Sequence, residues 1–364
     1  MAFSDFHGNV DIVNRLREMI SRDHLPHAVV LAGGRGAGKY TLALMLAQTL
    51  NCLDPKQTEG LPDFCGICAN CTRIAQACDL DARFAEAVEA RENLRETDKK
   101  ETRIFVQTHP DVLVIPPDPP QMLVKVDQVR HVSGEIYYRP AVGRERVYIF
   151  SDADFMKEAG NALLKVLEEP PGFATIFLLT DNPSALLSTI RSRCVYLRLT
   201  PLAISQIEDY LAEVRPDWKA KERSLVARVC GGALGRARSF DLSLYLAARR
   251  DALALLAPAM GARDHSDLFK VTETYRAGAD GKTKTQSTIR LLYSLLEDLL
   301  FVKSGTPELV RNQDMQAELR RMGEQIDFKW LVTATQKLSD LESGMRRNLQ
   351  RTLALDSFAT SLER

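Results

Sequence analysis

The sequence has no excess of charge of either sign and no long apolar run. Its 364 residues include 48 Lys and Arg against 48 Asp and Glu, so the formal net charge is zero. A neutral chain produces no global field that would attract or repel nucleic acid, so any DNA contact must come from a local patch or from a partner. No window reaches the ~18 apolar residues of a membrane span, and the N-terminus lacks the apolar core of a signal peptide. We therefore expect a cytoplasmic protein without membrane contact, in which the seven cysteines stay reduced or bind metal.

The stretch 147–194 carries alternating strand and helix signals. The apolar runs with the length and composition of buried strands are 147–150, 175–180 and 195–197. Helical segments separate these runs, and the first segment ends at Pro170 and Pro171. The pattern predicts an α/β fold with a central parallel sheet and helices on its faces. In such folds, functional residues lie at the carboxyl ends of the strands.

A glycine-rich loop joins a strand-like run at 28–32 to a helical run at 42–47. This is the context of a Walker A phosphate loop (P-loop), in which glycines let backbone N–H groups wrap a phosphate at a helix N-terminus. The residues of this loop that we predict to bind nucleotide are Gly33, Gly36, Gly38, Lys39 and Thr41. The residue after the lysine should hold Mg²⁺ through a short hydroxyl side chain. Tyr40 stands there instead, its phenol reaches too far, and Thr41 is rotated by ~100° around the helix.

The acidic tip after the 147–150 run shows a second departure from the pattern that ATP hydrolysis needs. An aspartate at the strand end should hold Mg²⁺, with a second acid beside it. Ser151 takes the first place and Asp152 the second, although a one-residue shift in the alignment would let Asp152 or Asp154 serve. The two departures argue against ATP hydrolysis by this chain. Nucleotide binding without turnover and a loop without any ligand both remain open.

Four cysteines directly after the phosphate-loop helix have the spacing of a zinc site. They are Cys52, Cys65, Cys68 and Cys71, in the array C-x12-C-x2-C-x2-C. The short spacings let one tight turn present several thiolates to a tetrahedral ion, and four protein ligands leave no open position. We therefore predict a structural Zn²⁺. Cys78 lies just outside the array and is an alternative ligand, whereas Cys194 and Cys230 are expected to pack as small apolar side chains.

Two segments of the sequence resemble a known family. They are 161–171, with the sequence NALLKVLEEPP, and 189–194, with the sequence TIRSRC. Both are similar to the clamp-loader branch of the AAA+ ATPases, and within that branch to the delta prime subunits of bacterial DNA polymerase III. The delta prime and tau/gamma subunits carry a similar four-cysteine module at this point of their chains.

The resemblance implies a division of the chain into three domains. These are an AAA+ nucleotide-binding-like domain at 1–200 with a zinc module at 52–78, a small helical lid at 201–243, and an all-helical collar for oligomerisation at 244–364. A densely charged segment at 79–103 departs from the family pattern, and we interpret it as a solvated helical insertion.

The resemblance also assigns roles to two arginines. Arg193, within Ser192-Arg193-Cys194, takes the place of an arginine finger that acts in trans on the ATP of the neighbouring subunit. Arg236 takes a second nucleotide-sensing position. Phosphoryl transfer builds negative charge, which a guanidinium meets with planar, permanently charged donors. The alternative for Arg193 is an ion pair with a local acid, as for most surface arginines.

The partners implied by the resemblance belong to DNA replication. The chain would join gamma/tau-type ATPase subunits and a delta subunit in a hetero-oligomeric ring of the DNA polymerase III holoenzyme, a DNA-directed DNA polymerase complex. That ring loads the sliding clamp onto primer-template DNA. Two functions remain open: a stator-like subunit that hydrolyses nothing but completes its neighbour's active site, and the gamma/tau-type motor itself. Tyr40 and Ser151 favour the stator, as does the end of the sequence at residue 364, where a motor often continues. A DNA-binding zinc module outside any ring fits the neutral charge less well.

Two apolar stripes beyond residue 244 predict amphipathic helices of the collar. The first consists of Ile289, Leu292, Leu296 and Leu299, and the second of Phe328, Leu331, Thr335 and Leu338. A last helix is expected at 348–362. Earlier in the chain, five basic residues are candidates for contacts with DNA phosphates, although scattered charges more often form a solvated surface. They are Lys125, Arg130, Arg139, Arg144 and Arg146.

Overall fold

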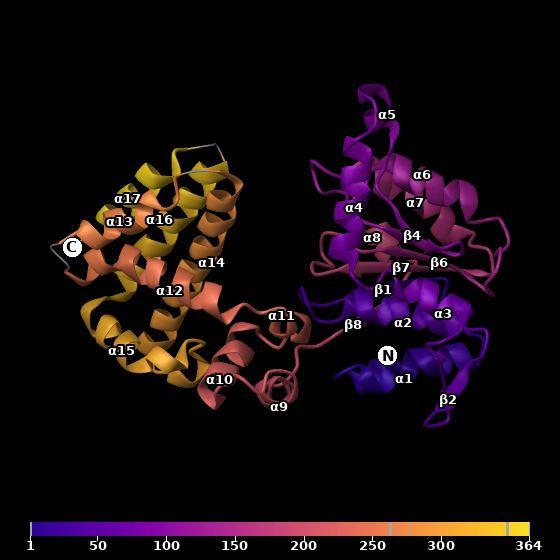
Figure 1. The fold of residues 1–364 in the computed structure, drawn as a ribbon, viewed down its shortest axis with the longest axis horizontal. Helices are drawn as coiled ribbons and strands as arrows, with labels where there is room; N and C mark the ends of the chain where they lie inside the picture. Colours follow the sequence, from indigo (N-terminus) through magenta and orange to yellow (C-terminus); the bar gives the residue numbers. More distant parts are fainter. Residues whose placement is uncertain (1, 262–263, 277, 347–348, 364) are drawn as a thin grey trace. The chain divides into compact units, whose positions relative to one another are not determined.

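The computed structural model describes residues 2–261, 264–276, 278–346 and 349–363 (Figure 1). The chain divides into two compact units. Unit 1 comprises Met1–Ala203 and Gly232–Arg236, and unit 2 comprises Ile204–Gly231 and Ala237–Arg364. Within the described ranges, no helix is both long enough and apolar enough to cross a membrane.

Unit 1 is built around a six-stranded sheet with the strand order β4-β5-β6-β7-β1-β8. The strands are β1 (Ala28–Ala32), β4 (Val106–His109), β5 (Val112–Ile115), β6 (Arg146–Phe150), β7 (Ala174–Thr180) and β8 (Val195–Arg198). Each neighbouring pair from β5 to β8 is parallel, with Val30 of β1 opposite Leu178 on one side and Tyr196 on the other. This arrangement confirms the predicted α/β fold with a central parallel sheet. Of the strands described in this sheet, only β4 departs from it, because it pairs antiparallel with β5.

Helices cover both faces of the sheet, and strand residues alternate between two apolar cores. Val29 and Leu31 of β1 belong to the first core, and Ala28 and Val30 to the second. The helices of the first core are α1 (Val10–Ser21), α2 (Lys39–Asn51) and α3 (Ala69–Ala75); those of the second are α6 (Val126–Glu135), α7 (Lys157–Glu168) and α8 (Ser188–Arg191). Figure 1 shows α2 and α3 on one side of the strands and α6 and α7 on the other. A strand buried on both faces reads as a continuous apolar run, which is why these strands were visible in the sequence.

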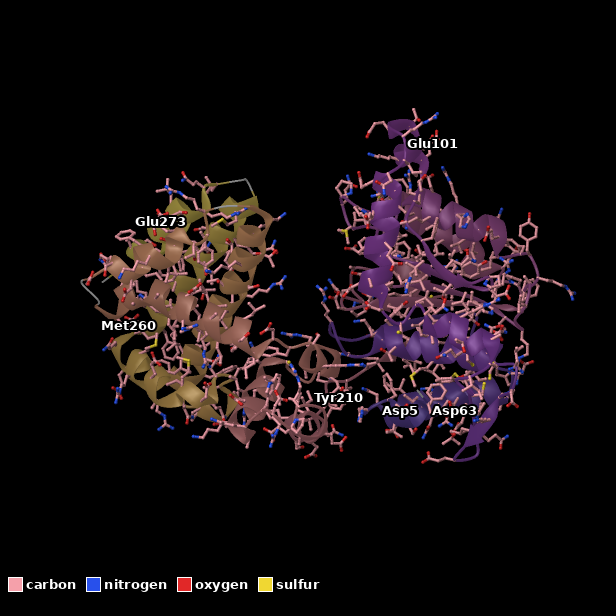
Figure 2. All side chains as sticks on the ribbon, viewed as in Figure 1. Asp5, Asp63, Glu101, Tyr210, Met260 and Glu273 are labelled. Atoms are coloured by element: carbon pink, nitrogen blue, oxygen red, sulfur yellow. The ribbon has the colours of Figure 1, made fainter. Side chains whose placement is uncertain are left out.

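The charged insertion is attached to unit 1 through one buried carboxylate. Its helices are α4 (Leu80–Glu92) and α5 (Glu96–Glu101), and Glu101, the last residue of α5, is labelled in Figure 2. Asp118, fully buried after β5, accepts hydrogen bonds from Arg91 of α4 at 2.8 Å and from Lys125 at 2.9 Å. It also accepts the backbone N–H of Ile104 at 3.1 Å. Asp118 therefore joins the end of α4 to the segment before β4 and to the start of α6.

Four of the five basic residues considered for DNA contacts have partners within the chain. Lys125, Arg130 and Arg146 form ion pairs with Asp118, Asp127 and Glu135, respectively. The Arg144 guanidinium donates to the carbonyls of Leu50 and Cys52, at 3.2 and 3.1 Å. These carbonyls lie at the C-terminal end of α2, where backbone acceptors lack helical partners. Lys125, Arg144 and Arg146 thus contribute to the fold of unit 1, whereas the pair of Arg130 is exposed and contributes little.

All regular secondary structure among the described residues of unit 2 is helical, and the unit has its own apolar core. Its longer helices are α9 (Ile204–Val214), α10 (Ala220–Val229), α12 (Leu242–Leu256), α13 (Ser266–Glu273), α14 (Gly278–Lys303), α15 (Gln316–Gln325), α16 (Phe328–Arg346) and α17 (Arg351–Ser361). The first predicted stripe is buried along α14, as expected. The last helix begins at Arg351, and Asn348, its predicted start, lies outside the described residues.

The second predicted stripe is partly wrong. Phe328 is 52% exposed, and Thr335 is exposed as well. The buried face of α16 consists of Leu331, Ala334, Leu338 and Leu341. At ~100° per residue, Phe328 and Thr335 lie roughly 50° beyond the edge of the buried face, which is at Leu331. The small side chain of Ala334 takes a place on that face, where the predicted stripe had Thr335 instead.

Candidate nucleotide and metal sites

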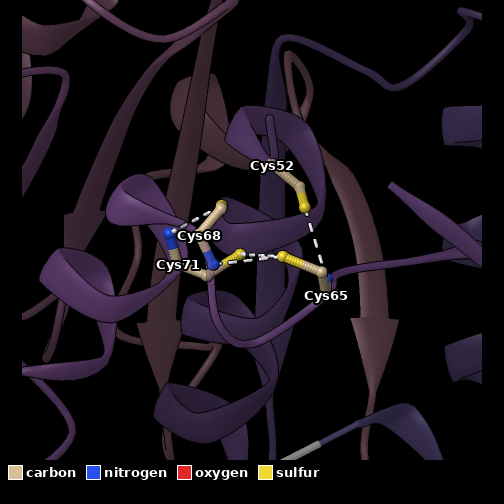
Figure 3. A group of neighbouring side chains, drawn as sticks. All are labelled: Cys52, Cys65, Cys68 and Cys71. Carbon is tan, nitrogen blue, oxygen red and sulfur yellow. Dashed lines mark hydrogen bonds between the residues drawn. The ribbon is translucent and has the colours of Figure 1, made fainter. Parts of the chain in front are cut away.

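The four predicted metal ligands lie together in unit 1 (Figure 3). Cys52 caps the end of α2, and Cys65 follows a hairpin of β2 (Lys56–Thr58) and β3 (Leu61–Asp63). Cys68 caps the start of α3, and Cys71 lies within that helix. The four sulfur atoms lie within 4.8 Å of one another. Tetrahedral Zn²⁺ with Zn–S bonds of ~2.3 Å separates its sulfurs by about 3.8 Å, so these residues fit a four-coordinate ion.

Backbone N–H groups point at the sulfur atoms of this cluster. The Cys68 N–H donates to Cys65 Sγ at 3.3 Å, and the Cys71 N–H donates to Cys68 Sγ at 3.5 Å. Burial raises the pKa of the Cys68 thiol, but the N–H groups of Cys71 and Leu53 and the neighbouring thiols outweigh burial and lower this pKa to about 6. Such donors favour the thiolate form, which is the form that binds metal. Cys78 is exposed and does not belong to the cluster, so the structure gives no support to it as an alternative ligand.

The glycine-rich loop links β1 to the first turn of α2. Gly36 and Gly38 adopt left-handed backbone conformations, with φ of 83° and 88°, which favour glycine. The Gly33 N–H donates to the carbonyl of Thr180 at the end of β7, at 3.1 Å. Lys39 Nζ donates to the carbonyls of Gly33 and Gly34, so the lysine folds back onto its own loop.

Tyr40 points away from the loop and toward the cysteine module. Its hydroxyl donates to the carbonyl of Ala77, just after α3, at 2.7 Å. The ring packs against the apolar core that contains Cys52 and Cys71, and burial raises the pKa of the phenol. The hydroxyl group that follows the lysine is therefore engaged in the cysteine module. Thr41, the next residue, is exposed.

The acidic tip after β6 lies near the lysine of the loop. Burial and the charges of Asp181 and Asp154 raise the pKa of Asp152. Burial lowers the pKa of Lys39, while Asp181 and Asp152 act in the opposite direction. The ends of β6 and β7 thus bring Asp152 and Asp181 to the phosphate loop. Asp181 was not among the predicted site residues, although its position directly after a strand end was a usable signal.

Arg236 lies beside the phosphate loop within unit 1. The N–H of Gly235 donates to the carbonyl of Gly36 at 2.9 Å. A Cβ added to Gly36 would lie 2.8 Å from Cγ of Arg236, so only glycine allows this approach. The start of α11 (Leu234–Arg238) is therefore placed directly over the loop.

Arg193 lies in the turn after α8 and forms an ion pair with a residue of α7. Its Nη2 lies 2.6 Å from the Glu168 carboxylate, and its Nη1 donates to the carbonyl of Thr189 at 3.0 Å. The local ion pair that we considered as the alternative role is therefore present. Its partner Glu168 was not predicted.

A strand–loop–helix phosphate cradle on a parallel sheet, joined to a four-thiol module, defines this chain as a P-loop α/β protein of the AAA+ type. Residues 8–203 match the family model described as DNA polymerase III, delta subunit, and the chain belongs to this family.

The related proteins are subunits of DNA polymerase III. The chain is 28% identical over 301 residues to subunit tau of Escherichia coli, covering 81% of this chain and 36% of the relative. It is 27% identical over 313 residues to subunit delta' of Bacillus subtilis, covering 85% and 82%. It is 32% identical over 209 residues to subunit delta' of Pseudomonas aeruginosa, covering 57% and 53%. The chain thus spans only about a third of the tau relative (36%). The predicted resemblance to delta prime subunits, within the clamp-loader branch, is confirmed.

Proposed function

We propose that this chain is a non-hydrolysing, stator-like subunit of a DNA polymerase III clamp loader. The observation that carries the proposal is the hydrogen bond from the Tyr40 hydroxyl to the Ala77 carbonyl, at 2.7 Å. In a hydrolysing P-loop, a Ser or Thr hydroxyl at this place holds Mg²⁺. Here the hydroxyl is committed to another module, and Ser151 cannot replace an aspartate at the end of β6.

In this proposal the chain supplies Arg193 to the ATP of a neighbouring gamma/tau-type subunit. The guanidinium stands at the surface, with 34% of the side chain exposed, and can meet the negative charge that builds during phosphoryl transfer. A delta subunit, the sliding clamp and primer-template DNA complete the set of partners. Residues 1–200 act as the nucleotide-binding-like domain, 201–243 as the lid, and 244–364 as the collar that joins the ring.

The cysteine cluster holds a structural Zn²⁺ in this proposal. Cys52, Cys65, Cys68 and Cys71 would provide all four ligands, which leaves no open coordination position for catalysis. The bound ion would crosslink the end of α2 to the hairpin and to α3.

The second candidate is the gamma/tau-type motor. Two observations favour it: Asp152 and Asp181 lie close enough to Lys39 to influence its pKa, and a tau subunit matches across 81% of this chain. A motor subunit hydrolyses ATP itself, whereas a stator-like subunit hydrolyses none and only completes the active site of its neighbour.

An ATPase assay separates the two candidates. We expect no steady turnover by the isolated chain, and we expect Arg193→Ala to lower DNA-stimulated hydrolysis when the chain is assembled with its cognate motor subunits. An arginine finger can contribute ~10³-fold at its own site, but the remaining sites of the ring limit the loss in a bulk assay. Arg191→Ala, which removes an exposed arginine two positions earlier, is the matched control.

Two outcomes would contradict the proposal. Steady hydrolysis by the isolated chain, abolished by Lys39→Ala, would establish the motor instead. A ring with Arg193→Ala that hydrolyses ATP at the wild-type rate would exclude Arg193 as a finger.

A further inference from the structure

Glu168 holds the guanidinium of Arg193 in place. Oε1 of Glu168 lies 2.6 Å from Nη2, while Nη1 donates to the Thr189 carbonyl at 3.0 Å and to Ser192 Oγ at 3.5 Å. The guanidinium is therefore bound on two sides, although the side chain is partly exposed.

Both groups that bind the guanidinium stand on well-fixed elements. Glu168 is the last residue of α7, whose Leu167 is buried in the second apolar core. The Leu167 carbonyl also lies 3.1 Å from Nε2 of His27, directly before β1. The start of α8 packs closely on α7, because a Cβ added to Gly160 would lie 3.0 Å from the Leu187 side chain. The backbones that carry Glu168 and Thr189 therefore belong to packed elements, while the Glu168 side chain itself is half exposed.

We infer that Glu168 is a positioning residue for Arg193, which orders the guanidinium before the nucleotide of a neighbouring subunit reaches it. The inference rests on the proposed function, since it concerns how the proposed finger is presented. An unrestrained arginine samples many rotamers, and holding the group in its working geometry removes that entropic barrier from the reaction. A guanidinium has more N–H donors than these contacts use, so donors remain for a phosphate oxygen.

Glu168 has two opposing effects on the rate of hydrolysis: its negative charge repels the phosphate, and its hydrogen bond orders Arg193. Their magnitudes decide which effect is larger. A carboxylate beside the finger repels an approaching phosphate, but exposed charges are screened by water and salt, and their pairwise energies are small. Misplacement of a catalytic group has a far larger effect on rate. Removal of the carboxylate should therefore slow hydrolysis by the partner.

The test is a double-mutant cycle in the ring assembled with the cognate motor subunits, with DNA-stimulated ATP hydrolysis as the readout. Glu168→Ala should lower the Arg193-dependent part of kcat by at least about fivefold, which is the rate equivalent of the upper range for exposed ion pairs, with KM for ATP unchanged. Glu168→Gln keeps an oxygen acceptor and should lower it less. In an Arg193→Ala background, Glu168→Ala should have no further effect, because Glu168 acts through Arg193. Glu169→Ala, at the neighbouring exposed glutamate, should retain the wild-type rate.

The outcomes separate this inference from the proposed function. If Arg193→Ala leaves hydrolysis unchanged, the proposed function fails and the inference fails with it. If Arg193→Ala slows hydrolysis while Glu168→Ala leaves it unchanged or speeds it, the finger stands and the positioning role is overturned. A loss from Glu168→Ala that persists in the Arg193→Ala background also overturns that role, since Glu168 would then act independently. Thermal unfolding of each variant checks that the fold is intact.

Discussion

At Tyr40 the backbone of a phosphate loop is retained, but the side chain lacks the short hydroxyl that would bind Mg²⁺. The loop before it keeps the glycine conformations and the lysine of a phosphate cradle, whereas its own hydroxyl is bound to the Ala77 carbonyl. The hydroxyl at this position therefore has a structural role, where a Ser or Thr hydroxyl would bind Mg²⁺. This hydrogen bond fastens the first turn of α2 to the end of the cysteine module.

Tyr40→Phe should destabilise unit 1 while preserving its packing. The substitution removes the hydroxyl and leaves the Ala77 carbonyl without this donor, which costs about 1 kcal/mol of unfolding free energy. Urea unfolding followed by circular dichroism measures this loss of stability: the midpoint urea concentration should fall, while the dependence of the unfolding free energy on urea stays unchanged. Tyr196→Phe, at an exposed tyrosine of β8, is the control and should leave the midpoint unchanged. Equal midpoints for Tyr40→Phe and the wild type would show that the hydrogen bond contributes nothing.

Among single residues, the sequence could identify the functional ones whose partners lie close to them in the chain. The cysteine array was readable because ligand spacing is local, and the structure places all four sulfur atoms within reach of one ion. Glu168 could not be found this way, since its partner Arg193 lies 25 residues later in the turn after α8, and the pairing depends on how α7 packs on α8. The direction of the Tyr40 side chain likewise depends on a carbonyl 37 residues away.

Among the elements, the insertion formed by α4 and α5 depends on Asp118 for its attachment. Burial raises the pKa of this carboxyl, but Lys125, Arg91 and the Ile104 N–H outweigh burial and lower it below the ordinary value of 3.8. A carboxyl with a depressed pKa in the folded chain stabilises the fold above its unfolded pKa. That contribution is lost as the pH falls through the folded pKa.

Asp118→Asn should therefore destabilise unit 1 at pH 7 by about 2–3 kcal/mol, because it weakens a buried group with charged partners. The difference from the wild type should begin to shrink as the pH falls below about 4, where the carboxyl of the unfolded chain takes up a proton. It should disappear only once the pH has passed the lower pKa of the folded carboxyl. Urea unfolding at pH 7 and pH 3 measures both quantities. Asp127→Asn, at an exposed ion pair, should change the unfolding free energy by less than about 1 kcal/mol. A pH-independent difference for Asp118→Asn would contradict this role of the charge.

Helices and strands, like residues, could be predicted where the signal is local in the sequence and not where it depends on distant contacts. The strands β1, β6, β7 and β8 contain short apolar runs, and the length and composition of these runs were sufficient to place them. The edge strand β4 contains Gln107 and Thr108 and was missed, because its pairing with β5 is fixed by tertiary contacts. The short hairpin β2–β3 was missed for the same reason, since Arg17 of α1 binds the carbonyls of Thr58 and Leu61 and thereby holds it.

At the scale of the whole molecule, the two units have separate apolar cores. The cysteine cluster belongs to unit 1, and its four residues come from the end of α2, the segment after the hairpin and the start of α3. The chain has two tryptophans, Trp218 and Trp330, and both lie in unit 2. Tryptophan fluorescence therefore reports on unit 2, whereas circular dichroism reports on both units.

Removal of the metal should destabilise unit 1 selectively. Metal analysis of the protein purified under reducing conditions should find close to one Zn²⁺ per chain, and chelation should lower the unfolding temperature seen by circular dichroism, because binding energy of such a site is folding energy. The transition seen by tryptophan fluorescence should stay in place. Cys68→Ser should imitate chelation, and Cys78→Ser, outside the cluster, should not. Absence of zinc, or equal shifts in both signals, would count against a structural ion confined to unit 1.

The Tyr40–Ala77 hydrogen bond also makes the proposed loss of hydrolysis difficult to reverse. Replacement of Tyr40 by threonine would return a short hydroxyl to the loop, but it would remove the brace to the cysteine module at the same time. Ser151 would still lack the carboxylate needed at the end of β6. Under the proposed function, Tyr40→Thr alone would weaken unit 1 without supplying an aspartate at position 151, so a return to hydrolysis would need at least two substitutions.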